Sequence, residues 1–243
     1  MRKILNIGIL TNDHDFLIDF LLKKINKIKN INYYLFISKN SNPKKELRIF
    51  KSRTKNYFLH QKLNLSTSKK IESFFVKSHN STEFYKIIKR KKIDYLYNSA
   101  TTNKISFKTI KQTKGIINIH PGILPYYRGC TSTEWSLFKN DPLGITAHFM
   151  DRSYDSGPII KIKYLKFKKK DIKEYQDIRI KIYLSILDLS KNIFMKIKKG
   201  NINIYKQKEE ASKYYPVIKE NLLNKIKKKI KNKKYIFNKK NIL

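Results

Sequence analysis

The chain has 243 residues, 40% of them apolar, so it is long enough to bury the core of one large domain or of one domain with an appendage. No run approaches ~18 consecutive apolar residues, which argues against a membrane span. A single cysteine excludes a framework of internal disulfides and is typical of a reducing compartment. The first residues, MRKILNIGIL, lack a small-residue cleavage site, so we expect a β-strand there and a cytoplasmic protein.

The formal net charge of +37 has two interpretations. One is a polyanionic partner, either nucleic acid or an anionic membrane surface. The other is compositional drift, because only seven of the 55 basic residues are Arg, and Lys, Asn, Ile and Tyr all have A/T-rich codons. Residues 115–160 carry three basic residues against four acidic ones. We therefore favour drift with solvated lysine faces, expect no membrane partner, and keep nucleic acid as the alternative.

Strands and helices are predicted to alternate over the first ~120 residues. Apolar runs predict strands at 3–10, 32–38, 72–77, 93–100 and 116–120. Helices are predicted after the first strand, with Thr11, Asn12 or Asp13 as N-cap, from Pro43 within 42–70, at 81–92 and at 105–113. This alternation predicts an α/β fold, a mostly parallel twisted sheet with helices on both faces.

The second half is predicted to hold fewer elements. We expect strands at 144–150 and from residue 161, a long helix over 171–199 ended by Gly200, and a short strand at 202–207. The helix has a broad apolar stripe that indicates core packing. From Val217 the tail carries ten Lys against Glu220 alone, and we expect a helix there to about residue 234. We divide the chain into a catalytic domain, 1–205, and a basic C-terminal extension, 206–243.

Five of the seven glycines and four of the six prolines lie within residues 115–160. These residues fix backbone angles that others reach only with strain, so the stretch holds a particular loop geometry. Asn118 and His120 are two apart on a predicted strand and share one face. The strand ends at Pro121, and ligands of open α/β sheets bind at such carboxyl ends. Asp155, in the loop after strand 144–150, is expected at the same rim.

An amide, an imidazole and a carboxylate suit transfer of an acyl group to an amine. Asn118 and protonated His120 can donate hydrogen bonds to the oxyanion of a tetrahedral intermediate, each worth ~3–4 kcal/mol. Asp155 can keep His120 protonated and relay a proton from the amine through water. No nucleophile is needed, and Cys130 has no evident base partner. No Cys/His set has the spacing of metal ligands, so we expect no metal.

The pattern N-I-H-P-G-x-L-P-x-Y-x-G at 118–129, followed by G-x-T-x-H-F-M-x(4)-D-x-G-P at 144–158, resembles the formyltransferases that use 10-formyltetrahydrofolate. That family includes glycinamide ribonucleotide, methionyl-tRNA and sugar-nucleotide formyltransferases and formyltetrahydrofolate hydrolases. The resemblance is strong over 93–160 and holds elsewhere in outline. It implies a Rossmann-like formyltransferase domain, with 10-formyltetrahydrofolate as cosubstrate and Asn118, His120 and Asp155 as catalytic residues. It also implies a folate pocket between the loops Asn98–Ile105 and Asp151–Asp155, with contacts from Asn98, Ser99, Ala100, Thr101, Ile105, Asp151 and Tyr154.

Departures from the family patterns bear on the acceptor. The loop LTNDHDF after the first strand is acidic and lacks the glycines of a phosphate loop, which argues against a phosphoribosyl acceptor. Tyr214-Tyr215-Pro216 resembles methionyl-tRNA formyltransferases, but only 27 residues follow, fewer than their C-terminal barrel needs. No regulatory domain of a hydrolase is visible. We expect a small amine, such as an amino sugar linked to a nucleotide; the alternatives are an amine carried by RNA and a nucleic-acid-binding protein with an idle site.

Other aromatic and histidine side chains have more ordinary interpretations. We expect His148 to be a packed core histidine, His60 and His79 to lie at the surface, and Trp135 to anchor a helix at 132–139. His14 is a candidate for substrate contact at the rim of the first strand. Tyr126, Tyr127 and Arg128 line the acceptor pocket or form a packed lid, and the sequence leaves both open.

Overall fold

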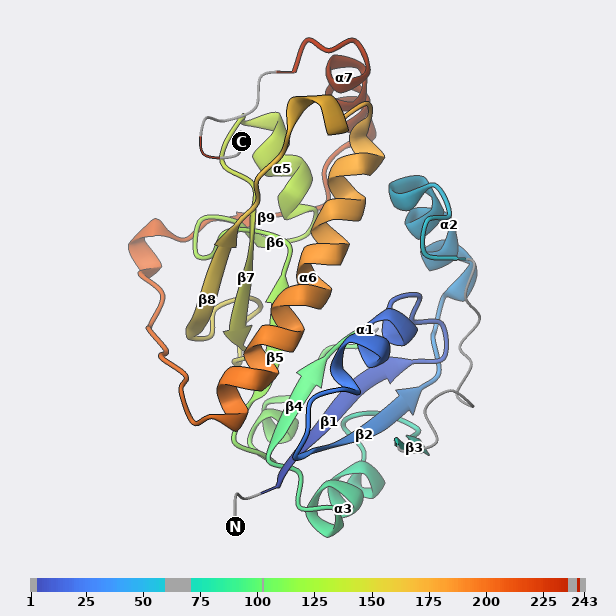
Figure 1. The fold of residues 1–243 in the computed structure, drawn as a ribbon, viewed down its shortest axis with the longest axis vertical. Helices are drawn as coiled ribbons and strands as arrows, with labels where there is room; N and C mark the ends of the chain where they lie inside the picture. Colours follow the sequence, from blue (N-terminus) through green and yellow to red (C-terminus); the bar gives the residue numbers. More distant parts are fainter. Residues whose placement is uncertain (1–3, 60–70, 102, 236–239, 241–243) are drawn as a thin grey trace.

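The computed structural model describes residues 4–59, 71–101, 103–235 and 240. Its centre is a seven-stranded sheet in the order β3-β2-β1-β4-β5-β7-β8 (Figure 1). The strands are β1 (Leu5–Asn12), β2 (Ile31–Ser38), β3 (Glu72–Phe75), β4 (Tyr95–Asn98), β5 (Ile116–His120), β7 (Gly144–Phe149) and β8 (Ile159–Tyr164). The first five run parallel, whereas β7 and β8 are antiparallel to their neighbours. The predicted α/β fold with a mostly parallel sheet is confirmed.

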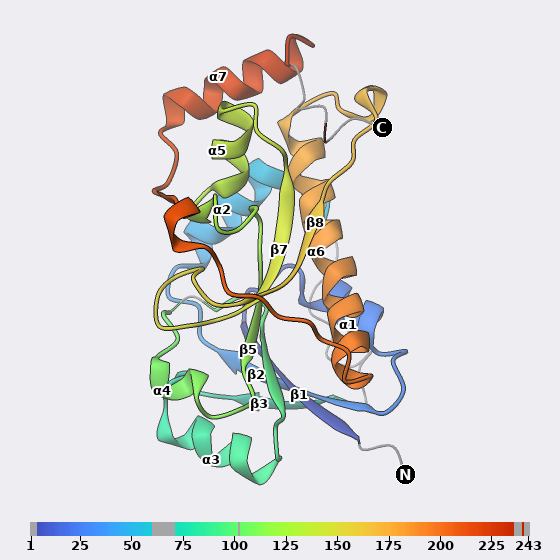
Figure 2. The same ribbon diagram turned by 90° about the vertical axis from the view of Figure 1, so that its left-hand side faces the viewer.

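Helices cover both faces of the sheet, as predicted (Figure 2). The helices are α1 (Ile18–Ile25), α2 (Pro43–Thr54), α3 (Thr82–Arg90), α4 (Phe107–Ile110), α5 (Ser132–Phe138), α6 (Tyr175–Lys198) and α7 (Glu220–Lys231). One face carries α1 and α6, and the other carries α3 and α4. Helix α3 begins at the predicted cap, where Ser81 accepts a hydrogen bond from the Phe84 N–H.

Two apolar clusters hold these layers together. The larger one joins alternate side chains of β1, such as Ile7 and Ile9, to Ile182 and Ile193 of α6. The smaller one packs Leu10 and other side chains from the opposite face of the sheet against α3. Each fully buried Leu or Ile side chain contributes about 1.5–3 kcal/mol, and the side-chain period of two in a strand assigns neighbours to opposite clusters.

The ends of several elements differ from the sequence predictions. Strand β1 continues to Asn12, whose partner in β2 is Ser38, so helix α1 starts only after Leu17 and has no side-chain cap. Residues 202–207 form no strand; Tyr205 makes an isolated bridge to Ile159. His79 is buried, and its Nε2 lies 3.0 Å from the Phe36 carbonyl, so the prediction of a surface histidine was wrong. His60 lies outside the described residues.

The C-terminal part packs on the sheet domain in the described residues. Strand β9 (Tyr214–Tyr215) runs parallel to β6 (Arg128–Gly129), and Trp135 Nε1 donates to the Pro216 carbonyl at 2.8 Å. Helix α7 lies across α5 and α6 and buries Ile226 and Ile230 against the larger core cluster (Figure 2). The division into 1–205 and 206–243 remains a prediction.

None of the helices formed by the described residues is both long enough and apolar enough to cross a membrane.

Candidate active site

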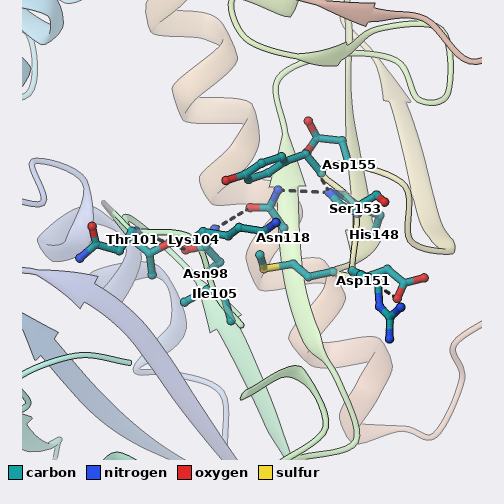
Figure 3. Close-up of a pocket in the computed structure, with 13 residues that line it drawn as sticks. Asn98, Thr101, Lys104, Ile105, Asn118, His148, Asp151, Ser153 and Asp155 are labelled. Atoms are coloured by element: carbon teal, nitrogen blue, oxygen red, sulfur yellow. Dashed lines mark hydrogen bonds and ion pairs between the residues drawn. The ribbon is translucent and has the colours of Figure 1, made fainter. Parts of the chain in front are cut away.

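A cavity of about 270 Å³ opens where β4, β5 and β7 meet (Figure 3). Its walls come from the loop after β4, from β5, and from the end of β7 with the loop that follows. The lining residues are Asn98, Thr101, Asn103, Lys104, Ile105, Asn118, His148, Met150, Asp151, Arg152, Ser153, Tyr154 and Asp155. Because Asn98 ends β4 and Asn118 lies on the parallel strand beside it, the cavity occupies the carboxyl edge at which ligands of such sheets bind.

Most of the predicted folate contacts line this cavity. Both predicted loops contribute, and the predicted residues that line the cavity are Asn98, Thr101, Ile105, Asp151 and Tyr154. Ser99 and Ala100 face β1 instead: the Ser99 hydroxyl donates to Asp15 at 2.6 Å, and Asn12 Nδ2 donates to the Ala100 carbonyl at 2.7 Å. Those two residues therefore tie the loop to β1 and to the segment that follows it, and they do not line the cavity.

Asp155 and His120 face each other beside the cavity. Asp155 Oδ1 lies 3.3 Å from His120 Nδ1, and Asp155 Oδ2 accepts from the Gly129 N–H at 2.9 Å. Burial alone would raise the pKa of the carboxyl. The charge and the hydrogen bond of His120, together with the Gly129 N–H, outweigh that effect and lower the pKa of Asp155 to about 2. The carboxylate is therefore ionised at neutral pH.

The other ring nitrogen of His120 faces protein rather than the cavity. His120 Nε2 lies 2.6 Å from the Tyr127 carbonyl and 2.9 Å from the Ser132 hydroxyl. A carbonyl only accepts, so Nε2 carries a hydrogen, and Nδ1 facing a carboxylate carries the second. This arrangement is that of an imidazolium. His120 lies behind Asp155 and does not line the cavity, which differs from the predicted direct donation to a reacting oxygen.

Asn118 does line the cavity, and both ends of its amide have partners. Asn98 Nδ2 donates to Asn118 Oδ1 at 3.2 Å, and Asn118 Nδ2 donates to His148 Nε2 at 3.1 Å (Figure 3). His148 is the cross-strand neighbour of Asn118 in the antiparallel pair β5–β7. The predicted burial of His148 is confirmed, whereas its contact with Asn118 was not predicted. The available signal was the period of two that places Thr146, His148 and Met150 on one face.

The loop between β5 and β6 needs glycine at two points. A Cβ on Gly122 would lie 2.9 Å from His120 Nε2 and 2.7 Å from the Ser132 Cβ. At Gly129 the φ angle is +89°, and a Cβ there would meet the Tyr215 carbonyl at 2.5 Å. Because glycine has no Cβ at these two positions, the loop can bring the Tyr127 carbonyl to His120 and the Gly129 N–H to Asp155.

This loop is packed rather than open to the cavity of Figure 3. Tyr127 is buried and stacks on Tyr215 with ring centroids 5.1 Å apart. Buried Arg128 donates to Gln207 and to Glu209. Tyr126 is 53% exposed. None of the three residues 126–128 lines the cavity of Figure 3, whereas Tyr126 and Tyr127 line a second cavity of about 340 Å³, so the acceptor-pocket interpretation of this loop stays a prediction.

Gln207 supports the Asp155 loop from far along the chain. Its Nε2 donates to the Asp155 carbonyl at 2.8 Å and to the Gly157 carbonyl at 2.7 Å. Its Oε1 accepts from Arg128 Nη2 at 2.8 Å. No pattern in the sequence predicted a role for this residue, because the segment around Gln207 has no regular structure and the carbonyls it contacts lie about fifty residues earlier.

The polar groups of the acidic loop after β1 form hydrogen bonds within the loop and with neighbouring segments. Asn12 Oδ1 accepts from the His14 N–H at 2.7 Å, and Asp13 Oδ1 accepts from the Asn40 N–H at 2.7 Å. Buried Asp15 accepts from Thr11 and Ser99. His14 contacts Asp13 and does not line the cavity of Figure 3.

The chain belongs to the formyl transferase family, whose model matches residues 9–183. It is similar to a GDP-perosamine N-formyltransferase of Brucella melitensis biotype 1, 31% identical over 108 residues, which are 44% of this chain and 40% of that protein. It is also similar to a methionyl-tRNA formyltransferase of Caldanaerobacter subterraneus subsp. tengcongensis, 29% identical over 105 residues, 43% of this chain and 33% of that one. These alignments thus span less than half of either relative.

A similar solved structure is the N-formyltransferase from Helicobacter canadensis in complex with folinic acid and dTDP-3-aminofucose. Its TM-score is 0.58 at 16% identity, over 86% of this chain and 70% of that one. At this identity the likeness shows the fold. The expected family and its Rossmann-like formyltransferase fold are therefore confirmed.

Proposed function

We propose that this protein transfers the formyl group of 10-formyltetrahydrofolate to a primary amine on a small molecule, such as an amino sugar linked to a nucleotide. One observation supports this most directly: the amide of Asn118 and the carboxylate of Asp155 line the same cavity, and His120 lies behind the carboxylate at 3.3 Å. The family of the chain is consistent with that chemistry.

The cavity suits the flat heterocyclic end of a folate. Ile105 and Met150 offer apolar contact, and Tyr154 adds an aromatic ring. Asn98, Thr101 and Asp151 supply polar groups that would pair with ring nitrogens and an exocyclic amine. The Helicobacter canadensis structure holds folinic acid, a formylated folate, which supports the same ligand class here.

The proposed reaction proceeds through a tetrahedral intermediate. The neutral amine attacks the formyl carbon, a C–N bond forms, and the carbonyl oxygen becomes an oxyanion. An N–H of Asn118 donates to that oxygen, a contact worth about 3–4 kcal/mol in the transition state. Asp155 takes a proton of the attacking amine through a water molecule. Collapse restores the carbonyl, breaks the bond to the folate nitrogen, and returns the proton to that nitrogen.

His120 serves this reaction through its charge. The imidazolium keeps Asp155 ionised, so the carboxylate is ready to accept a proton. The partners of His120 at Tyr127 and Ser132 hold the ring still. Direct donation from His120 to the oxyanion would require the ring to turn away from these partners.

The acceptor is assigned by analogy with relatives. The Brucella melitensis relative is a GDP-perosamine N-formyltransferase, and the Helicobacter canadensis structure holds dTDP-3-aminofucose. Both acceptors are amino sugars on nucleotides. The second candidate is an amine carried by transfer RNA, and the observation in its favour is the similarity to a methionyl-tRNA formyltransferase.

A direct assay separates these candidates. The purified protein is incubated with 10-formyltetrahydrofolate and either a panel of nucleotide-linked amino sugars or aminoacylated initiator transfer RNA. Tetrahydrofolate release and the added formyl mass are measured. We expect formylation of an amino sugar and none of the RNA. Formylation of the RNA alone would favour the second candidate, and a folded protein that binds no folate would exclude both.

A further inference from the structure

The amide of Asn118 has two ends of similar shape and opposite chemistry. Its NH₂ group donates hydrogen bonds and its oxygen accepts them, so only one orientation can stabilise an oxyanion. We propose that His148 is a positioning residue that holds the NH₂ group of Asn118 toward the cavity. The proposal rests on the proposed function, because it concerns the donor of that same reaction.

The partners of His148 fix which of its ring nitrogens carries hydrogen. His148 Nδ1 lies 2.8 Å from the Phe149 carbonyl, which only accepts, so Nδ1 is the protonated nitrogen. In the neutral ring Nε2 then has a free lone pair. That lone pair accepts from Asn118 Nδ2 at 3.1 Å. A reversed amide would place the Asn118 oxygen against this lone pair, and two acceptors would face each other.

The position of the Asn118 amide oxygen follows from the hydrogen bonds of Asn98. Thr101 donates to Asn98 Oδ1 from both its hydroxyl, at 2.9 Å, and its backbone N–H, at 3.3 Å. Asn98 must therefore direct its own NH₂ group to Asn118 Oδ1, which lies 3.2 Å away. The donors thus run in one direction from Thr101 through Asn98 and Asn118 to His148 (Figure 3).

One hydrogen of the Asn118 NH₂ group is used in this series, and the second has no partner among the described residues. Asn118 lines the cavity, so that second N–H is the donor available to a ligand oxygen. In the transition state the contact would be worth about 3–4 kcal/mol. Its direction depends on His148, which need not touch the reacting atoms.

The series of hydrogen bonds from Thr101 to His148 requires a neutral His148. The surroundings of the His148 ring favour that state. Burial lowers the pKa of His148 to about 4, against the opposing effect of Asp155, whose Oδ1 lies 3.7 Å from Nε2. The charges of His120 and Arg128 lower the pKa further. Below this pKa Nε2 becomes a donor that faces the donor of Asn118. The amide would then reverse, and kcat should fall as pH decreases through about 4.

Two variants distinguish a positioning role of His148 from a role in packing alone. In His148→Phe an aromatic ring remains but the acceptor is lost, and we expect kcat to fall about 10²-fold with little change in the KM for folate. In His148→Gln the side-chain oxygen can accept from Asn118 and does not titrate. We expect that variant to keep kcat within about tenfold of wild type and to lose the acid limb near pH 4. Lys196→Gln, at an exposed lysine of α6 outside the cavity, is the control.

The test combines pH profiles of kcat with ¹⁵N spectra of histidine-labelled protein, and circular dichroism verifies folding at each pH. The spectra report the tautomer of His148 independently of turnover, and we expect hydrogen on Nδ1 and none on Nε2 above pH about 5. A protonated Nε2 at pH 7, an unchanged kcat in His148→Phe, or an acid limb retained in His148→Gln would overturn the proposal. If wild-type protein formylates no amine while the expected tautomer is found, the proposed function fails and the assigned orientation stands.

Discussion

Two parts of the same carboxyl edge of the sheet carry polar side chains and behave in opposite ways. At β4, β5 and β7 the polar groups surround a cavity, and one N–H of the Asn118 amide has no partner in the part of the chain that the structure describes. At β1 and β2 the side chains of Asn12, Asp13 and Asp15 bond to one another's segments and to Asn40. Polar residues at a strand end thus define a site only where some of their hydrogen bonds are left for a ligand.

Two carboxylates show the same contrast in their ionisation. Asp155 pairs with His120, and its pKa is lowered to about 2. Asp15 is buried, and burial raises its pKa although Ser99, Leu17 and Thr11 donate to it. A cation nearby therefore distinguishes a carboxylate that stays ionised into the acid range from one that burial shifts toward its protonated form.

The largest effect is expected from Asp155→Asn. The amide cannot accept the proton of the amine and no longer balances the charge of His120, so we expect turnover to fall about 10³-fold. Turnover is measured as formylated product per time at saturating folate. The matched control at the other end of the edge is Asp13→Asn, which should stay within a few-fold of wild type. Equal losses in both variants would remove the contrast between the two regions.

Asn118→Ala should follow, with a loss of about 10²- to 10³-fold in kcat, because one preorganised donor to the oxyanion disappears. Binding of a folate analogue, measured by calorimetry, should weaken much less. Asn40→Ala is the control, since Asn40 forms hydrogen bonds with Asp13 and Glu46, away from the cavity of Figure 3. A loss confined to folate binding, with kcat unchanged, would show that Asn118 only holds the cosubstrate.

Gln207→Ala is expected to have a smaller effect. It removes the two donors to the Asp155 and Gly157 carbonyls and the acceptor of buried Arg128. We expect about a tenfold loss of kcat through a displaced Asp155 loop, and about 1–3 kcal/mol less free energy of unfolding. The exposed neighbour Lys206 provides the control variant Lys206→Ala. Chemical denaturation and steady-state kinetics on the same samples distinguish a loosened site from a globally weaker fold.

The sequence predicted the parts of the site that depend on local pattern. Asn118 and His120 follow from a period of two before Pro121–Gly122, and Asp155 follows from its place in the loop after the predicted strand 144–150. His148 acquires its contact with Asn118 because β7 runs antiparallel to β5, a direction that no local pattern encodes. Gln207 depends on a long-range contact, and Ser99 turns toward β1 because Asp15 is buried beside it. Site residues that follow from local periodicity were therefore predicted, whereas contacts that depend on long-range pairing of segments were not.

The smallest expected effect concerns the pH dependence of the free energy of unfolding. Asp155 and Asp15 should contribute to it with opposite signs. The pKa of Asp155 falls from 3.8 to about 2 on folding, so its ionised pair contributes about 2 kcal/mol above pH 3.8, and this contribution is lost as pH falls toward 2. Asp15 has a raised pKa, so the folded state holds its proton more tightly than the unfolded state does. Its charge therefore opposes folding once pH rises through 3.8 and beyond.

Asp15→Asn should remove that opposing contribution while leaving turnover within a few-fold of wild type. The expected gain in unfolding free energy is present at pH 7 and absent at pH 3, and we expect it to stay below about 1 kcal/mol, because Asn replaces one accepting oxygen with a donor group that faces Thr11 or Ser99. Urea denaturation at both pH values measures the difference. Asp155→Asn in the same experiment should lose stability at pH 7 and little at pH 2. If both variants respond to pH in the same direction, the cation beside Asp155 is not what separates the two ends of the edge.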